Sequence, residues 1–265
     1  MYIVYIAVLG LCAGSFVNAF VWRLHENKNW INDRSVCTSC RHELAAIDLV
    51  PIISYFLLRG KCRYCHKKIS IQYPLIEAVT ALIFIASYIY WPNNMTGFGV
   101  ILFATWLLIV TLFMSLALYD IKWMLLPNKI VYSTLAVVFI YQVIILSFFS
   151  SDAYGTLIND VLSVAVGGCF FYAIYQFSKG KWIGGGDVKL GFVLGLLVGS
   201  PAKSFLVLFL AALMGSFVAL PLIAVNKMNK KSVIPFGPFL IAATIIVVLF
   251  GSIIINWYMK NILMI

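Results

Sequence analysis

Long apolar stretches alternate with short polar ones along most of this chain. The apolar stretches cover residues 2–22, 74–91, 99–119, 129–150, 161–178, 188–200, 203–225 and 236–257. Most of them approach the roughly 20 residues that a helix needs to cross a bilayer core, although 188–200 is shorter. The pattern predicts an all-α polytopic membrane protein with about eight transmembrane helices.

One polar segment, residues 23–73, interrupts this pattern after the first apolar stretch. It contains all 3 histidines and four of the 6 cysteines of the chain. We therefore predict three parts: a first transmembrane helix over 1–22, a small cytoplasmic insert over 23–73, and a membrane core of seven helices over 74–265. Residues 1–22 resemble a signal peptide, but the basic region that precedes a signal peptide's apolar stretch is absent, so we interpret them as a retained helix.

Composition excludes a soluble protein, because 63% of the 265 residues are hydrophobic and only 11% are charged. The net charge of +10 follows the positive-inside rule and needs no nucleic acid to explain it. If the N-terminus lies outside, all of the 19 basic residues except Lys203 and Lys260 fall in loops on the cytoplasmic side. This orientation also places Asp120 and Asp187 on the cytoplasmic side.

Two Cys-x-x-Cys pairs in the insert have the spacing of a metal site. The first pair is Cys37 with Cys40, and the second is Cys62 with Cys65. Four thiolates complete a closed tetrahedral zinc site, which supplies structure and not catalysis, and a reducing cytoplasm argues against disulfides. Thiol redox chemistry, an iron–sulfur cluster, or ligation by the neighbouring His42 or His66 remain alternatives.

Asp120 and Asp187 each stand at the end of an apolar stretch, where a carboxylate is costly to desolvate. Two carboxylates that share a proton can activate water against a peptide carbonyl. Asp187 follows Gly184 and Gly186, which would let a substrate backbone approach closely. The alternative is that each aspartate merely caps a helix.

Three further residues are candidate supporting groups. Lys122 and Lys189 follow the two aspartates by two positions and could keep one carboxylate ionised. Glu77 lies at the start of the second apolar stretch, where a structural ion pair is as good an interpretation as a functional role. Helix direction suggests where the shared proton resides: Asp120 ends a helix and Asp187 begins one, so the helix dipole predicts the proton mainly on Asp120.

The residues as a set resemble the bacterial type IV prepilin peptidases, which are intramembrane aspartyl proteases with a Gly-x-Gly-Asp motif. The matching segments are Gly14-Ser15-Phe16-Val17-Asn18 with Arg23, the four cysteines, Asp48 to Tyr55, Leu58 to Cys62, Tyr73-Pro74-x-x-Glu77, Asp120 with Leu126-Pro127, Gly184 to Leu190, and Pro235 to Leu240. No single segment is specific, but their order along the whole chain is.

The resemblance implies the function. Such enzymes are multi-pass proteins of the bacterial inner membrane and cleave the basic leader of type IV prepilins or pseudopilins after a glycine, on the cytoplasmic side, with Asp120 and Asp187 as the catalytic pair. Members with the cysteine insert are usually also N-methyltransferases that use S-adenosylmethionine. The implied partners are these substrates and membrane lipid, with no nucleic acid.

Two departures from the family pattern and two other classes of function bear on this interpretation. Asn128 stands where the family often has Asp, and Leu24 follows Arg23 where a proline is often close. The second departure concerns the region credited with methylation, so a peptidase alone is an alternative. A transporter would need ionisable residues at the bilayer midplane, and a scaffold would leave the aspartate and glycine arrangement unexplained.

Overall fold

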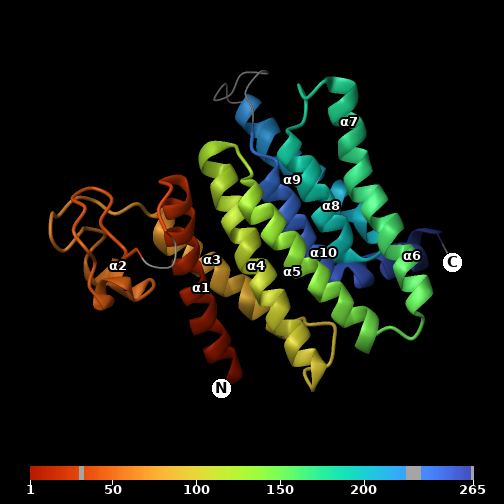
Figure 1. Ribbon diagram of the computed structural model, residues 1–265, viewed down its shortest axis with the longest axis horizontal. Coiled ribbons are helices and arrows are strands. Elements are labelled where there is room, and N and C mark those ends of the chain that lie inside the picture. The colour runs from red at the N-terminus through yellow and green to blue at the C-terminus, as the bar shows by residue number, and fades with distance from the viewer. Residues whose placement is uncertain (30–32, 225–233, 264–265) are drawn as a thin grey trace. The chain divides into compact units, whose positions relative to one another are not determined.

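The computed structural model describes residues 1–29, 33–224 and 234–263, and their regular structure is helical (Figure 1). The predicted end of a span at residue 225 and the basic residues Lys227, Lys230 and Lys231 lie outside the described residues. The helices are α1 (Tyr2–His25), η1 (Ala46–Leu49), α2 (Ile53–Leu57), α3 (Gln72–Ile89), α4 (Phe98–Trp123), α5 (Asn128–Phe148), α6 (Ala153–Val164), η2 (Ala165–Cys169), α7 (Phe170–Ser178), α8 (Gly185–Val198), α9 (Pro201–Ala224), α10 (Gly237–Tyr258) and η3 (Met259–Leu263).

Seven helical segments of the described chain are long and apolar enough to cross a membrane. They confirm the all-α polytopic architecture, and α6, η2 and α7 together form one of them, Ala153–Ser178. The predicted span 188–200 is the exception: it corresponds to α8, which has only 14 residues. At 1.5 Å per residue, α8 covers about 21 Å, less than the roughly 30 Å of a bilayer core.

The chain divides into two compact units. Unit 1 comprises Met1–Trp91 and Val110–Leu118, and unit 2 comprises Pro92–Ile109 and Tyr119–Ile265. Residues 74–91, which the sequence analysis assigned to the membrane core, thus cluster with α1 and the cysteine insert.

In unit 1, α1 lies along α3 (Figure 1). Gly14 permits this close approach, because a Cβ added there would lie 2.5 Å from the Cα of Glu77. Asn18 ties the two helices together: its amide nitrogen donates to the carbonyl oxygen of Tyr73 at 3.2 Å, and its amide oxygen accepts from the Gln72 side chain at 3.2 Å. The Gly14-to-Asn18 motif is therefore a helix-packing element.

In unit 2, α8 is enclosed by its neighbours α5, α6, η2 and α10. Its buried residues lie on most of its sides, and the face that carries Lys189, Phe192 and Leu196 is half-buried. Gln142 of α5 closes its far end by donating to the carbonyl oxygen of Leu196 at 2.5 Å and to the carboxylate of Asp160 at 3.1 Å. Asp187, in the first turn of α8, is thereby held on a rigid, buried element.

Candidate active site and metal site

Asp120 lies in the last turn of α4, which continues to Trp123 before Met124 ends it in the left-handed conformation. The helix is thus longer than the predicted span that closed before Asp120. The residue is only 5% exposed. Its Oδ2 accepts a hydrogen bond of 3.0 Å from the backbone N–H of Gly237, at the start of α10. This donor lies 117 residues away in the sequence.

Gly237 is shaped for this contact. A Cβ added to Gly237 would lie 2.6 Å from the Oδ2 of Asp120, closer than two such atoms can approach. Pro238 follows in the first turn of α10, where a missing N–H costs nothing. The first amides of a helix carry partial positive charge, so this hydrogen bond favours the ionised form of Asp120.

Asp187 lies in the first turn of α8, outside the seven membrane-length helices. Gly184 is the N-cap residue, and its backbone amide hydrogen-bonds the Asp187 carboxylate. Burial raises the pKa of Asp187 to about 6, with the negative charge of Asp120 as a second cause. The two carboxylates are therefore close enough to influence one another.

These contacts oppose the proton position that helix direction predicted. The dipole argument considered only the helices that carry the two aspartates. It could not include the amide of Gly237, which brings the N-terminus of a third helix to Asp120. That donor stabilises a charge on Asp120, and burial raises the pKa of Asp187 to about 6, so both contacts act against the proton position predicted from helix direction.

The glycines before Asp187 differ in what surrounds them. A Cβ added at Gly186 would lie 3.0 Å from the Cβ of Leu126, in the segment after α4. At Gly184, the nearest atom would be the Oδ2 of Asp187 at 3.6 Å, an ordinary contact. Gly186 is thus required for packing, whereas Gly184 is exposed and would accept a methyl group without crowding Asp187.

Neither predicted lysine forms an ion pair with an aspartate among the described residues. Lys189 donates to the Oδ1 of Asn128 at 2.7 Å, and Lys122 lies over the ring of Trp123 at 5.2 Å from its centre. Asn128 is the position where the sequence departs from the family pattern, and its partner is therefore Lys189. The structure gives no support to a direct role for these lysines in ionising the pair.

Glu77 belongs to unit 1 and is 7% exposed. Its Oε2 accepts a hydrogen bond of 2.7 Å from the backbone N–H of Ile52 in the insert, and the hydroxyl of Ser15 also donates to it. Glu77 thus links the insert to α1 and α3. The sequence analysis offered an ion pair as one interpretation of Glu77, but its partners here are a backbone amide and a hydroxyl.

The four predicted cysteine ligands converge. The sulfur atoms of Cys37, Cys40, Cys62 and Cys65 all lie within 4.8 Å of one another, and none is in a disulfide. Cys37 and Cys65 are 3.9 Å apart, close to the roughly 3.8 Å between two ligands of tetrahedral zinc with 2.3 Å bonds. The geometry fits one metal ion held by four thiolates.

Each cysteine pair lies in a knuckle with the same backbone pattern, a repeat that the sequence did not reveal. In the first, the backbone N–H of Cys37 donates to the carbonyl oxygen of His42 at 2.9 Å, and Arg41 has a φ of 62°. In the second, the backbone N–H of Cys62 donates to the carbonyl oxygen of Lys67 at 2.9 Å, and His66 has a φ of 57°. The ring of His42 lies at a tilt of 36° against that of Tyr64, with 3.7 Å between their centres. Among the described residues, the cluster of possible metal ligands contains the four cysteines and neither His42 nor His66.

The knuckle backbone also favours the thiolate that a metal requires. Burial opposes ionisation of the Cys37 thiol, but hydrogen bonds from the backbone amides of Cys40 and Ser39 outweigh it and lower its pKa to about 7.

Sequence reasoning missed the contacts of Gly237 and Ile52. Both lie in segments that were noted as family matches, without a role. The signal for Gly237 was a glycine between two prolines at the start of an apolar stretch. For Ile52 the sequence offers no signal, because its backbone N–H makes the contact.

Comparison with known proteins agrees with the division of the chain. Residues 8–91 match the bacterial peptidase A24 N-terminal domain, and residues 102–220 match the type IV leader peptidase family. No solved structure matches the chain with significance.

The curated relatives match over almost their full length. A prepilin leader peptidase/N-methyltransferase of Bacillus subtilis is 32% identical over 255 residues, which cover 96% of each chain. Proteins of the same name from Aeromonas hydrophila and Vibrio cholerae are 29% and 30% identical over 99% and 93% of this chain, and 96% of their own length. This chain therefore belongs to the bacterial type IV leader peptidase family and is a membrane-bound peptidase.

Proposed function

We propose that this enzyme removes the leader peptide of type IV prepilins or pseudopilins by aspartyl hydrolysis, with Asp120 and Asp187 as its catalytic pair. One observation carries the assignment of residues: two carboxylates, one buried on α4 and one half-buried on α8, lie close enough for the charge of one to raise the pKa of the other. Such a pair can hold one proton between two acids near neutral pH.

The contacts suggest a division of roles. Asp120, held by the Gly237 amide, acts as the base that takes a proton from the attacking water. Asp187 starts protonated and donates to the carbonyl oxygen as the water oxygen bonds to the carbonyl carbon. When the C–N bond of the tetrahedral intermediate breaks, the proton on Asp120 passes to the leaving amine. One hydroxyl of the intermediate returns its proton to Asp187 as the product C=O forms. Gly184 is exposed beside Asp187, and the extended substrate backbone would approach the pair there.

The second activity we propose is methylation of the new N-terminus. The released amine would attack the methyl group of S-adenosylmethionine, lose a proton and leave S-adenosylhomocysteine. The names of the relatives support this activity. Zinc in the four-cysteine site would hold the insert of unit 1 in shape and take no part in either reaction.

We also propose an orientation in the bacterial inner membrane. The N-terminus lies outside, and the insert and both aspartates face the cytoplasm. The charge bias of the sequence supports this orientation. Substrate and lipid are then the partners of the enzyme, with no role for nucleic acid.

The test is to incubate the purified enzyme with a prepilin and isotope-labelled S-adenosylmethionine, and to follow truncation and methylation by mass spectrometry. Asp120→Asn and Asp187→Asn should each lower the cleavage rate by about 10³-fold or more, because each removes a proton-transfer group. Asp152→Asn is the matched control: Asp152 caps α6 by accepting from Gly155 at 3.0 Å, and asparagine caps equally well.

The outcomes separate the alternatives. Cleavage without label incorporation would indicate a peptidase alone. Folded aspartate variants that still cleave at the normal rate would exclude the aspartyl mechanism. No cleavage by the unaltered enzyme, with proton flux across liposomes that depends on Asp187, would indicate a transporter instead.

A further inference from the structure

One segment of the insert exposes an unusual amount of apolar surface. Residues 46–57, here called the docking segment, run from η1 through α2. Its exposed apolar side chains, with their exposed fractions, are Ile47 (60%), Leu49 (40%), Val50 (38%), Ile53 (57%), Phe56 (70%) and Leu57 (74%). Six exposed apolar side chains within twelve residues of a polar domain indicate contact with another apolar surface.

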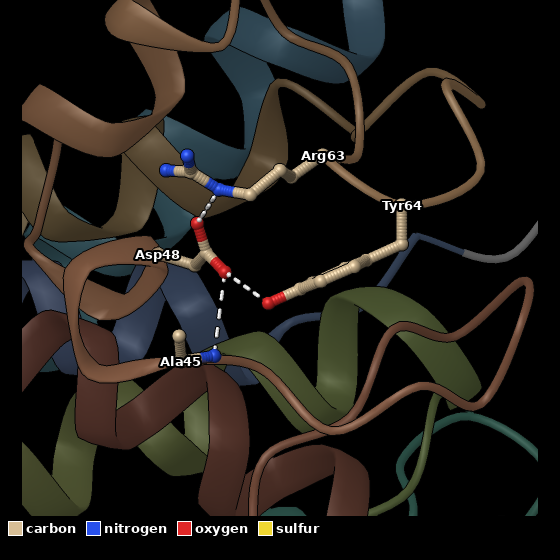
Figure 2. A network of polar contacts seen from close by, with 4 residues as sticks. All are labelled: Ala45, Asp48, Arg63 and Tyr64. Carbon is tan, nitrogen blue, oxygen red and sulfur yellow. Dashed lines mark hydrogen bonds and ion pairs between the residues drawn. The ribbon is translucent and has the colours of Figure 1, made fainter.

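The single charge of the docking segment is turned away from this surface. The side chain of Asp48 is only 3% exposed and forms an ion pair of 2.7 Å with the Nε of Arg63. Figure 2 shows its carboxylate between that guanidinium, the hydroxyl of Tyr64 and the backbone amide of Ala45. Burial alone would raise the pKa of Asp48, but the hydrogen bonds from Arg63 and Tyr64 outweigh it and hold it below its usual value.

The hydrogen bond between Ile52 and Glu77 fixes the level of the docking segment along the membrane helices. Glu77 lies five residues after the first residue of α3, Gln72, or about 7 Å along the helix axis. Its other donor, Ser15, lies ten residues before the last residue of α1, His25, or about 15 Å from that end. The middle of the docking segment therefore lies beside the membrane-length helices α1 and α3. Its position along them is inward from the end of α1 where the insert begins and from the start of α3 where it finishes.

The charge around the docking segment selects the partner. Glu26, Glu43 and Asp48 each form an ion pair with an arginine of the insert. The fourth acidic residue of the insert, Asp33, is exposed and accepts a hydrogen bond of 2.9 Å from the backbone N–H of Asn29. Exposed basic residues follow the segment at Arg59, Lys61, Lys67 and Lys68. An apolar surface flanked by basic side chains matches the interface of an anionic bilayer. A substrate with a basic leader would be repelled by the same charges.

We infer that the docking segment is a monotopic membrane anchor: Ile53, Phe56 and Leu57 enter the acyl region of the adjoining leaflet, and the basic residues bind anionic lipid headgroups. The second cysteine knuckle supplies both the Arg63 that holds Asp48 inward and most of the flanking charge. This inference is independent of the chemistry at Asp120 and Asp187.

The test uses the whole protein in nanodiscs that contain a phospholipid with a photoactivatable diazirine in its acyl chain. One set contains phosphatidylcholine alone, and the other contains a quarter phosphatidylglycerol. Lipid adducts are mapped by mass spectrometry. The first knuckle, with its exposed Thr38 and Ser39, is the internal negative reference, and α5, with Phe139 61% exposed, is the positive one.

We expect adducts on residues 46–57 to exceed those on the first knuckle by about tenfold, and to rise with phosphatidylglycerol and fall at high salt. The double variant Phe56→Ser with Leu57→Ser should lower them by about tenfold or more, because it removes two side chains that gain from burial. Both side chains are exposed, so the fold should survive, and adducts on α5 should stay unchanged.

Three results would overturn the inference. One is an adduct yield on residues 46–57 no higher than that on the first knuckle. Another is an equal yield in both lipid mixtures, which would exclude anionic lipid as the partner of the segment. The third is protection of the segment by an added prepilin in discs where no lipid adduct forms, which would identify it as a substrate surface.

Discussion

The four-cysteine site in unit 1 and the aspartate pair in unit 2 are assembled in opposite ways. Each cysteine pair is presented by one short knuckle, and the hydrogen bonds that shape a knuckle join residues no more than nine apart, such as Cys37 with His42 and Ser35 with Leu44. Asp120, Asp187 and Gly237 come from three helices, and the bond between the first and last spans 117 residues. A local site survives changes elsewhere in the fold, whereas a site built from distant helices depends on how each helix is placed.

The largest expected effect breaks the local site. Cys62 is buried and shares the metal site with three other thiolates, so Cys62→Ser should abolish stoichiometric metal binding, measured by elemental analysis of the purified protein. Hydrogen exchange should quicken in residues 36–68 and stay unchanged in unit 2. Cys169→Ser, outside the cluster, should retain the metal. Full metal content in Cys62→Ser would contradict the four-cysteine assignment.

The next effect breaks the distant site without touching an aspartate. Gly237→Ala places a methyl group 2.6 Å from the Oδ2 of Asp120, so the carboxylate must move and its hydrogen bond must weaken. We expect the cleavage rate to fall by about 10²-fold, as for other small displacements of reacting groups. Metal content should not change.

Gly215→Ala is the matched control for that variant. It adds the same methyl group in α9, where the nearest atom would lie at 3.6 Å, an ordinary contact. Its cleavage rate should equal that of the unaltered enzyme. Equal rates for both variants would show that the Gly237 contact has no role in positioning Asp120.

A third measurement sharpens the comparison by locating the proton of the pair. The infrared band of a protonated carboxyl at Asp187, isolated as a difference from Asp187→Asn, should be present at low pH and disappear as the pH rises through about 6. Asp120→Asn removes the negative charge that helps to raise this pKa, so the midpoint should fall. A band that belongs instead to Asp120 near neutral pH would restore the proton position predicted from helix direction.

The smallest effect separates two neighbouring glycines. Gly186→Ala should destabilise the protein by about 1–3 kcal/mol, because its added methyl group would crowd Leu126 at 3.0 Å. Gly184→Ala should stay within about 0.5 kcal/mol, as is usual for a substitution with no special contact. Thermal unfolding in detergent measures both. Equal destabilisation would indicate that Leu126 can move aside, and that the glycines serve the backbone alone.

The sequence determined by itself the features that depend on spacing and hydropathy. Apolar stretches of membrane length predicted the helices, because a backbone in lipid must satisfy its own hydrogen bonds. The Cys-x-x-Cys spacing predicted which four cysteines converge, because a knuckle is a local turn. The stretch 188–200 was predicted to be a span from the same kind of evidence, its hydropathy. In the structure it forms α8, whose apolar residues pack against α5, α6, η2 and α10 and do not face lipid alone.

Only the tertiary structure decided the partners of the polar groups at and near the site. The backbone amide of Gly237 donates to Asp120, and that of Ile52 donates to Glu77. Lys189 donates to Asn128 and not to an aspartate. Two of these three partners are backbone amides, which every residue except proline possesses, so side-chain identity carries no trace of them. Which amide reaches a carboxylate depends on where a distant helix begins, and helix packing sets that position.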